Sequence, residues 1–239
     1  MKPFVFRQFV LQQHTAVFRV GTDGVLLGAL CGITEQAQKN ILEVGTGTGL
    51  ISLMIAQRCL SANILAIDIN PEAVILATEN FGNSSFTNRL QAMNTDFKTF
   101  KTEQKFDLII SNPPYFESNP SEKDALARQQ RELTFTDLIG GVTENLSTRG
   151  LFSVIIPYAS VTEFIDHCQA NRLFLQRKIV IFGRKESEAK RAVLEFGFTA
   201  TEPVTEHFII EEAPRVYSEQ YLATTKDFHV FKTGATSDR

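Results

Sequence analysis

A glycine-rich turn with an acidic residue just before it is the first place in the chain where residue types and spacing suggest chemistry. The acidic residue is Glu43, near the end of the apolar segment 40–44. The turn that follows contains Gly45, Thr46, Gly47 and Gly49. The glycines let the backbone turn tightly and approach a ligand without side-chain obstruction. Dinucleotide-binding turns have the spacing GxGxxG and hold a pyrophosphate. A carboxylate at Glu43 would repel a pyrophosphate but suits an ammonium group, which favours S-adenosylmethionine over NAD.

Acidic residues also follow the next two apolar segments. Asp68 and Ile69 end the segment 63–69, and Asp96 and Phe97 come shortly after the segment 89–93. A carboxylate in the place of Asp68 can accept both ribose hydroxyls of a nucleoside. Asp96 can accept from the 6-amino group of adenine while Phe97 packs on the ring. Turn or helix-cap chemistry would explain either aspartate alone, but their joint placement predicts a nucleoside site.

The segment Asn112, Pro113, Pro114 and Tyr115 follows a fourth apolar run. Two prolines in succession fix the backbone and remove two N–H donors, which leaves carbonyl groups unpaired. The Asn112 side-chain oxygen and the Pro113 carbonyl can then accept both hydrogens of an exocyclic amine such as adenine N6 and direct its lone pair toward a methyl donor. Tyr115 offers a face for stacking an extruded base. A simple tight turn is the alternative, which the glycine turn upstream makes the weaker explanation.

The elements that must position these residues alternate between strand and helix, as in βαβ units. Strands are predicted at 40–44, 63–69, 89–93, 106–111 and 150–156, and helices begin at Leu50 and Pro71 and cover 135–146 and 160–168. Extended runs at 174–182, 192–198 and 207–210 predict antiparallel strands that finish the sheet. We therefore expect an α/β fold with a mostly parallel seven-stranded sheet, an antiparallel C-terminal strand and helices on both faces.

Together, the segments ILEVGTGTG (41–49), DINPEA (68–73) and TDF (95–97) resemble the Rossmann-like class I methyltransferases that use S-adenosylmethionine. The resemblance covers about 41–156. The Asn112–Tyr115 motif is similar to that of enzymes that methylate amide or exocyclic amino nitrogens. Their targets are adenine N6 in DNA and RNA, guanine N2 in ribosomal RNA, and a glutamine of translation release factors.

The N-terminal block 4–28 narrows the resemblance. Its glutamines and the run GTDGVLLG (21–28) are similar to the bacterial family of tRNA1(Val) (adenine(37)-N6)-methyltransferases, as are Ala127-Arg128, the run 132–138 and Lys190-Arg191. This resemblance spans nearly the whole chain. It implies methyl transfer from S-adenosylmethionine to N6 of adenine 37 in the anticodon loop of tRNA1(Val).

Thr22 and Asp23 are interpreted first as a helix cap, before a helix that buries Val25, Leu26, Leu27 and Leu30. The family resemblance implies that they also lie against the methionine end of the cofactor.

Net charge is −3, which argues against nucleic-acid binding through bulk positive charge. Between residues 172 and 191, however, seven basic residues stand against two acidic ones. A solvated sheet face explains such a run as well as an RNA contact does. If tRNA is the partner, surface patches must hold it, and the candidates are Arg7, Arg19, Arg128, Arg131, Arg184, Lys185, Lys190 and Arg191.

Three cysteines lie far apart, without the spacing of a metal site or a disulfide framework, so we expect no metal. No apolar stretch is long enough to span a membrane, and we expect a cytoplasmic protein without an obligate protein partner. We expect one domain over 1–232, made of a segment 1–39 over the cofactor site and a core 40–232. A flexible tail at 233–239 and a mobile loop at 116–130 complete the predictions.

Three alternatives stay open. A methyltransferase acting on a protein glutamine amide shares Asn112–Tyr115, but that class carries an N-terminal helical domain, and only about 40 residues precede the glycine turn here. A methyltransferase for guanine N2 of ribosomal RNA shares the motif as well. A non-catalytic binding module would have no physical reason to keep Glu43, Asp68, Asp96, Asn112 and Tyr115 together.

Overall fold

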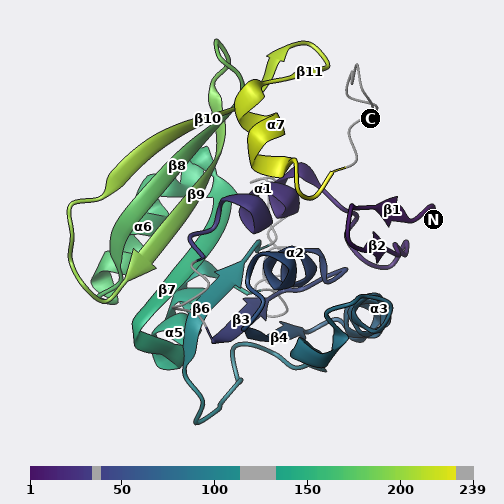
Figure 1. The fold of residues 1–239 in the computed structure, drawn as a ribbon. Helices are drawn as coiled ribbons and strands as arrows, with labels where there is room; N and C mark the ends of the chain where they lie inside the picture. The colour runs from purple at the N-terminus through teal and green to yellow at the C-terminus, as the bar shows by residue number, and fades with distance from the viewer. Residues whose placement is uncertain (34–38, 114–132, 230–239) are drawn as a thin grey trace, which may run out of the picture.

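In the computed structural model, residues 1–33, 39–113 and 133–229 are described, and they build one large sheet covered by helices on both faces (Figure 1). The strands of this sheet are β3 (Asn40–Val44), β4 (Asn63–Asp68), β5 (Leu90–Asn94), β6 (Phe106–Ser111), β7 (Leu146–Pro157), β8 (Phe174–Arg184), β9 (Ala189–Gly197), β10 (Val204–Ala213) and β11 (Val216–Tyr217). The helices are α1 (Thr22–Leu30), α2 (Leu50–Arg58), α3 (Pro71–Gly82), α5 (Phe135–Asn145), α6 (Val161–Ala170) and α7 (Glu219–Thr225), with 3-10 turns η1 (Thr87–Arg89) and η2 (Tyr158–Ser160).

The sheet order among the described strands is β11-β10-β8-β9-β7-β6-β3-β4-β5. Neighbouring strands from β5 to β7 pair in parallel, and β9 runs antiparallel between β7 and β8. The mostly parallel α/β fold with an antiparallel strand is therefore confirmed. Two details differ from the sequence prediction: nine strands of the sheet lie in the described residues, because β10 and β11 extend its edge, and β10 pairs in parallel with β8.

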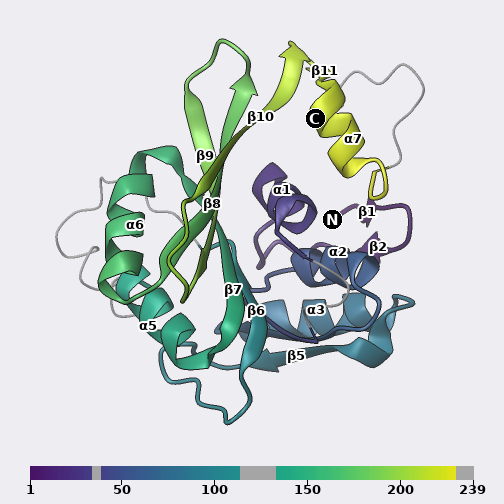
Figure 2. The same cartoon turned by 60° about the vertical axis from the view of Figure 1, so that its left-hand side comes forward.

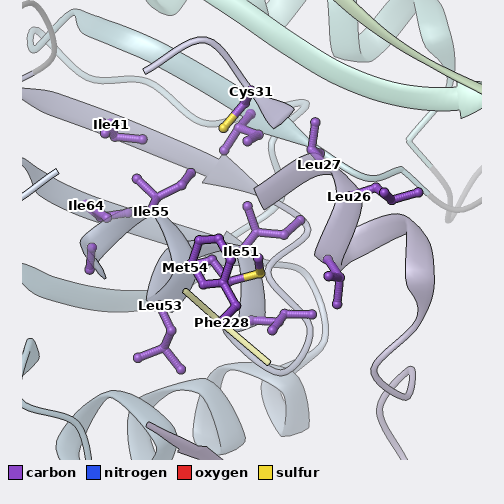
Figure 3. Packing of buried hydrophobic residues seen from close by; sticks show 14 of the residues in the cluster. Leu26, Leu27, Cys31, Ile41, Ile51, Leu53, Met54, Ile55, Ile64 and Phe228 are labelled. Atoms are coloured by element: carbon purple, nitrogen blue, oxygen red, sulfur yellow. The ribbon is translucent and has the colours of Figure 1, made fainter. Parts of the chain in front are cut away.

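Two apolar cores lie on opposite faces of the sheet. Helices α1, α2, α3 and α7 cover one face, whereas α5 and α6 cover the other (Figure 2). On the first face, Leu26 and Leu27 of α1 and Met54 of α2 pack with Ile41 and Phe228 (Figure 3). Central strands such as β3 are apolar almost throughout, because helices cover both sides of them.

Local sequence explains how the helices nearest the glycine turn begin. Gly49 precedes α2 in a left-handed conformation, with φ +80°. The Asn70 side chain accepts from the Glu72 amide, and Pro71 opens α3 where its missing N–H costs nothing. Both helices therefore begin at the carboxyl edge of the sheet, directly after β3 and β4.

The beginning of the chain packs against its C-terminal part. A hairpin of β1 (Phe4–Val5) and β2 (Val10–Leu11) precedes α1, and Phe6 forms a bridge to His229. The Arg7 amide donates to the Phe228 carbonyl, while the Phe6 and His229 rings stack with centroids 5.5 Å apart. Burial lowers the pKa of His229.

Helices of the described residues are too short or too polar to cross a membrane. The predicted loop 116–130 and tail 233–239 lie outside the described residues. The division into a segment 1–39 and a core 40–232 stays a prediction.

Candidate active site

A cavity of about 730 Å³ opens at the carboxyl ends of β3, β4 and β6. One wall comes from the sheet and the other from residues 16–24 of the N-terminal segment. Many of the residues predicted for the site line this cavity: Thr22, Asp23, Gly45, Thr46, Gly47, Asp68, Ile69, Asp96, Phe97, Asn112 and Pro113, together with Arg19. Residues from five separate stretches of the sequence are thus brought to one place.

Three glycines of the turn after β3 adopt positive φ angles that other residues rarely take. The values are +77° for Gly45, +55° for Gly47 and +80° for Gly49. Beside Gly45 there is open space, since a Cβ added to it would meet no atom within 4 Å. A Cβ on Gly49 would lie 2.6 Å from the Phe81 ring. Gly45 therefore leaves room for a ligand, whereas Gly49 is required by packing.

Glu43 lies beneath this turn and is only 1% exposed. Its Oε2 accepts from the Thr46 hydroxyl at 2.8 Å, from the Ser52 amide at 3.2 Å, and from the Ser52 hydroxyl. Burial raises the pKa of Glu43 to about 7. Glu43 therefore holds the glycine turn in shape through Oε2, while Oε1 makes no hydrogen bond within the described residues. Glu43 itself does not line the cavity.

Asp68 connects the end of β4 to the glycine turn. Its Oδ2 accepts from the Gly47 amide and its Oδ1 from the Asn70 amide, each at 2.9 Å. Each carboxylate oxygen can accept a further hydrogen bond. Ile69 beside it is exposed inside the cavity mouth. This corner can bind a diol while Asp68 stays fixed.

Asp96 and Phe97 form the neighbouring wall. Oδ1 of Asp96 accepts from the Lys98 amide at 2.9 Å, and its Oδ2 lies 3.8 Å from the Lys98 ammonium. Phe97 is buried in the second core, and its ring would lie 2.6 Å from a Cβ on Gly141. The ring thus has a fixed place and presents one side to the cavity.

Asn112 and Pro113 leave the end of β6 and face the same cavity as the glycine turn. The preceding Ser111 is buried and donates to the Val44 carbonyl at 2.9 Å, which ties the ends of β6 and β3 together. Asn112 is half-buried and Pro113 is buried. Pro114 and Tyr115 lie outside the described residues, as do Arg128 and Arg131.

Residues 12–20 form a strap over the glycine turn, which we call the N-terminal strap. Asn80 of α3 holds it: the Gln12 amide donates to Asn80 Oδ1 at 2.7 Å, and Asn80 Nδ2 donates to the Gln12 carbonyl at 3.1 Å and the Thr48 carbonyl at 2.8 Å. Val17 packs with Ala73 and Leu76 of α3. The buried Asn80 amide therefore joins the strap to the glycine turn.

Helix α1 follows the strap and was predicted to be capped by Thr22 and Asp23. That prediction is wrong: Gly21 occupies the N-cap position and no side chain caps the helix. Asp23 instead accepts from Arg191 of β9 at 2.9 Å. Thr22 and Asp23 both line the cavity, so they lie where contact with a ligand is possible.

Comparison with known proteins defines the family. A family model described as Methyltransferase small domain matches residues 21–150. A tRNA1(Val) (adenine(37)-N6)-methyltransferase from a Flavobacteriaceae bacterium is 58% identical over 97% of this chain and 100% of its own length. The chain belongs to the tRNA1(Val) (adenine(37)-N6)-methyltransferase family.

Other relatives agree with this membership. The family member from Phocaeicola vulgatus is 40% identical over 95% of this chain and 97% of its own length. A predicted O-methyltransferase from Agrobacterium tumefaciens has the same fold, with a TM-score of 0.69 and 19% identity over 86% of this chain and 96% of that one. The methyltransferase family and fold imply S-adenosylmethionine as the methyl donor.

The basic residues predicted to contact tRNA lie at several separate places on the protein. Arg19 lines the cavity. Arg191 lies next to the cavity, because it forms an ion pair with Asp23, which lines it. Arg7 donates to the His229 carbonyl, near the paired ends of the described chain. Arg184, Lys185 and Lys190 are exposed around the turn between β8 and β9. Within the described residues, no group of three His, Cys, Asp or Glu side chains is arranged to hold a metal.

The role of Asn80 in holding the N-terminal strap was not predicted from the sequence. Asn80 occupies the stripe of α3 that also contains Ala73, Leu76, Ala77 and Phe81. A polar residue on the apolar stripe of a helix must find buried hydrogen-bond partners, which was a usable signal. The role of Val17 and the exposure of Phe18 carried no comparable signal, because both depend on how the strap crosses the turn.

Proposed function

We propose that this chain transfers a methyl group from S-adenosylmethionine to N6 of adenine 37 in tRNA1(Val). The observation that carries the proposal is full-length similarity, 58% identical, to a protein of that name. The site supports it, since Asn112 and Pro113 face the same cavity as the glycine turn. A methyl donor and an amine acceptor can therefore meet in this cavity.

The cavity suits S-adenosylmethionine, which supplies an electrophilic methyl group when bound. The open space beside Gly45 admits a ligand close to the backbone, and Glu43 holds the turn in shape from beneath through Thr46 and Ser52. Asp68 accepts ribose hydroxyls, with Ile69 beside it. Asp96 accepts from the adenine amino group. We assign the same cofactor site to Thr46, Gly47, Thr22, Asp23 and Phe97, which line the cavity, whereas Gly49 shapes the turn without lining it.

The reacting amine is positioned by the segment after β6. Asn112 Oδ1 and the Pro113 carbonyl accept the two hydrogens of adenine N6, so that the nitrogen lone pair points away from the ring plane. Of the two motif residues outside the described part of the chain, we assign Pro114 to the same motif and Tyr115 to stacking on the extruded base. The methylated amine is strongly acidic while it carries its extra proton, so the proton leaves to water without a dedicated base.

Surface cations hold the tRNA. We assign this role to Arg7, Arg19, Arg128, Arg131, Arg184, Lys185, Lys190 and Arg191, and place the reaction in the cytoplasm, where tRNA is modified. Because each phosphate contact releases counterions, tRNA affinity falls steeply as salt rises.

The test is transfer of labelled methyl from S-adenosylmethionine to unmodified bulk tRNA, with ribosomal RNA and total protein offered in parallel reactions, followed by mass spectrometry of the labelled products. N6-methyladenosine in one tRNA species is the expected result. Label in protein instead of RNA would overturn the proposal in favour of a glutamine-amide methyltransferase. N2-methylguanosine in ribosomal RNA would overturn it in favour of the guanine alternative.

A second test addresses Asn112. Asn112→Ala is expected to bind S-adenosylmethionine as tightly as the wild type by calorimetry and to lose turnover by at least about 100-fold, as loss of a group acting on the reacting atoms does. Turnover at the wild-type rate would remove Asn112 from the reaction.

A further inference from the structure

Phe18 is unusual among the large apolar side chains of the described residues. It is 85% exposed, more than any other of them, and yet it lines the cavity. A residue with both properties must lie at the cavity mouth with its ring toward solvent. An aromatic ring held at a cavity mouth offers a face on which a flat ligand can stack.

The backbone that carries Phe18 is anchored on both sides. Val17 next to it is buried, and its Cγ1 lies 3.9 Å from the position of a Cβ on Gly47. Asn70 Nδ2 donates to the Ala16 carbonyl at 3.3 Å, and the Val20 amide donates to Gln13 Oε1 at 3.2 Å. These contacts fix the backbone around Phe18 even though its ring is exposed. The strap therefore presents the ring from a fixed base.

Exposure distinguishes this ring from groups deeper in the cavity. Thr46, Asp68 and Asp96 of the cofactor corner are buried or half-buried. Phe18 is 85% exposed and lines the same cavity. A ligand seated among these deeper groups therefore leaves much of the ring surface available to a second group at the mouth.

Chemistry narrows the occupant to a nucleobase. Arg19 follows Phe18, is exposed at the same mouth, and forms no ion pair within the described part of the chain. A flat ring next to a guanidinium matches a base and its phosphate, because a base stacks on an aromatic face and the phosphate attracts the cation. An apolar peptide would satisfy the ring but not the guanidinium.

Given the proposed tRNA substrate, we propose that Phe18 is a stacking platform at the cavity mouth for a nucleobase next to the methylated adenine. The target adenine passes into the cavity toward Asn112, and a flanking base stays outside on the Phe18 ring. Phe18 thus binds substrate, positions the extruded nucleotide and takes no part in the chemical step.

The chain contains no tryptophan, so Phe18→Trp creates a single fluorescent probe at the mouth. We expect quenching of this tryptophan by an anticodon stem-loop of tRNA1(Val) and little change on adding S-adenosylhomocysteine alone. The matched control is Leu60→Trp, which is 63% exposed just before β4 at the opposite edge of the sheet. The stem-loop should leave the control unquenched. Equal quenching of both probes would overturn the assignment of Phe18 as a stacking platform. Quenching of Phe18→Trp by S-adenosylhomocysteine alone would overturn it as well.

Kinetics give an independent readout. Phe18→Ala should raise KM for tRNA by about 5- to 150-fold, the range expected for losing one base–aromatic stack, with the Kd of S-adenosylmethionine and the melting temperature unchanged. Phe18→Tyr should restore KM, since it restores a ring. An unchanged KM in Phe18→Ala would overturn the inference while leaving the proposed methylation intact. Failure of the wild type to methylate any RNA would instead overturn the proposed function.

Discussion

Arg191 of β9 donates from Nε to Oδ2 of Asp23 at 2.9 Å, joining residues 168 positions apart in sequence. The contact ties the first turn of α1 to the antiparallel strand of the sheet. The other end of α1 is held in a similar way, because Arg58 donates to the carbonyls of Gly28 and Cys31 at 2.8 and 2.9 Å. A short helix at the edge of the cavity is thus fixed at both ends by guanidinium groups.

The Asp23–Arg191 pair should contribute little to stability, because both side chains are partly exposed. We expect Asp23→Asn and Arg191→Gln each to lower the free energy of unfolding by less than about 1 kcal/mol. The double variant should lose no more than either single one, since both changes remove the same contact. A double-mutant cycle by urea unfolding measures this, and fully additive losses would show that the two side chains do not interact.

Asn80 should matter far more, because it is fully buried and bonds to the strap and the glycine turn. Asn80→Ala leaves one buried and two part-buried backbone groups without partners, and we expect a loss of about 3 kcal/mol in unfolding free energy. The strap should also become easier to cleave in limited proteolysis. Glu79→Ala, at an exposed position of the same helix, should stay within about 0.5 kcal/mol of wild type. Similar values for the two variants would contradict the role of Asn80.

Gly49 and Gly45 share a left-handed backbone but differ in their surroundings. Gly45→Ala should lose about 1 kcal/mol from backbone strain alone. Gly49→Ala should lose about 3 kcal/mol, since its methyl group also meets the Phe81 ring. Thermal unfolding measures the loss of stability in both variants. The difference between the two losses is the contribution of the contact with Phe81. Gly82→Ala, with open space around it and no positive φ, should shift stability by less than about 1 kcal/mol. Equal losses at Gly45 and Gly49 would argue against the close contact.

Glu43 should give stability a characteristic pH dependence. Burial raises the pKa of its carboxyl from 4.5 to about 7, so the folded protein holds this proton more tightly than the unfolded chain does. Its contribution is complete below about pH 4.5 and is lost as pH rises toward 7. We expect unfolding free energy to fall across this window by at most about 1.4 kcal/mol per pH unit from this group. In denaturant titrations at several pH values, Glu43→Gln should flatten the slope, whereas the exposed Glu72→Gln should keep it. A slope unchanged in Glu43→Gln would assign the dependence to other groups.

The parts of the fold that follow from local pattern could be predicted from the sequence. Strands β3 and β6 lie at the predicted residues, because a buried parallel strand is a continuous apolar run that ends at polar residues. Helix α3 begins at Pro71 as predicted, since proline is favoured at the first helical position. The cavity walls at Asp68 and Asn112 follow from these strand ends.

Features that depend on distant contacts could not be predicted. Strands β1, β2 and β11 have two residues each, too few to show an alternating pattern. Strand β7 begins at Leu146 rather than at 150, because its polar first residues gain regular structure from its neighbour β6. Asp23 looked like a cap because its strongest partner, Arg191, lies on a strand that no local rule connects to it.

The bridge between Phe6 and His229 has a consequence for how the protein is made. Synthesis reaches His229 about 10 to 45 s after Phe6 at typical rates of elongation. Until then, Phe6 can stack on Phe9 but lacks the ring of His229, and both lack the apolar cluster that Phe228 completes. A copy that stops short of these residues leaves part of this aromatic surface exposed to water. The amino-terminal hairpin is therefore fully covered only after the last described residues have been made.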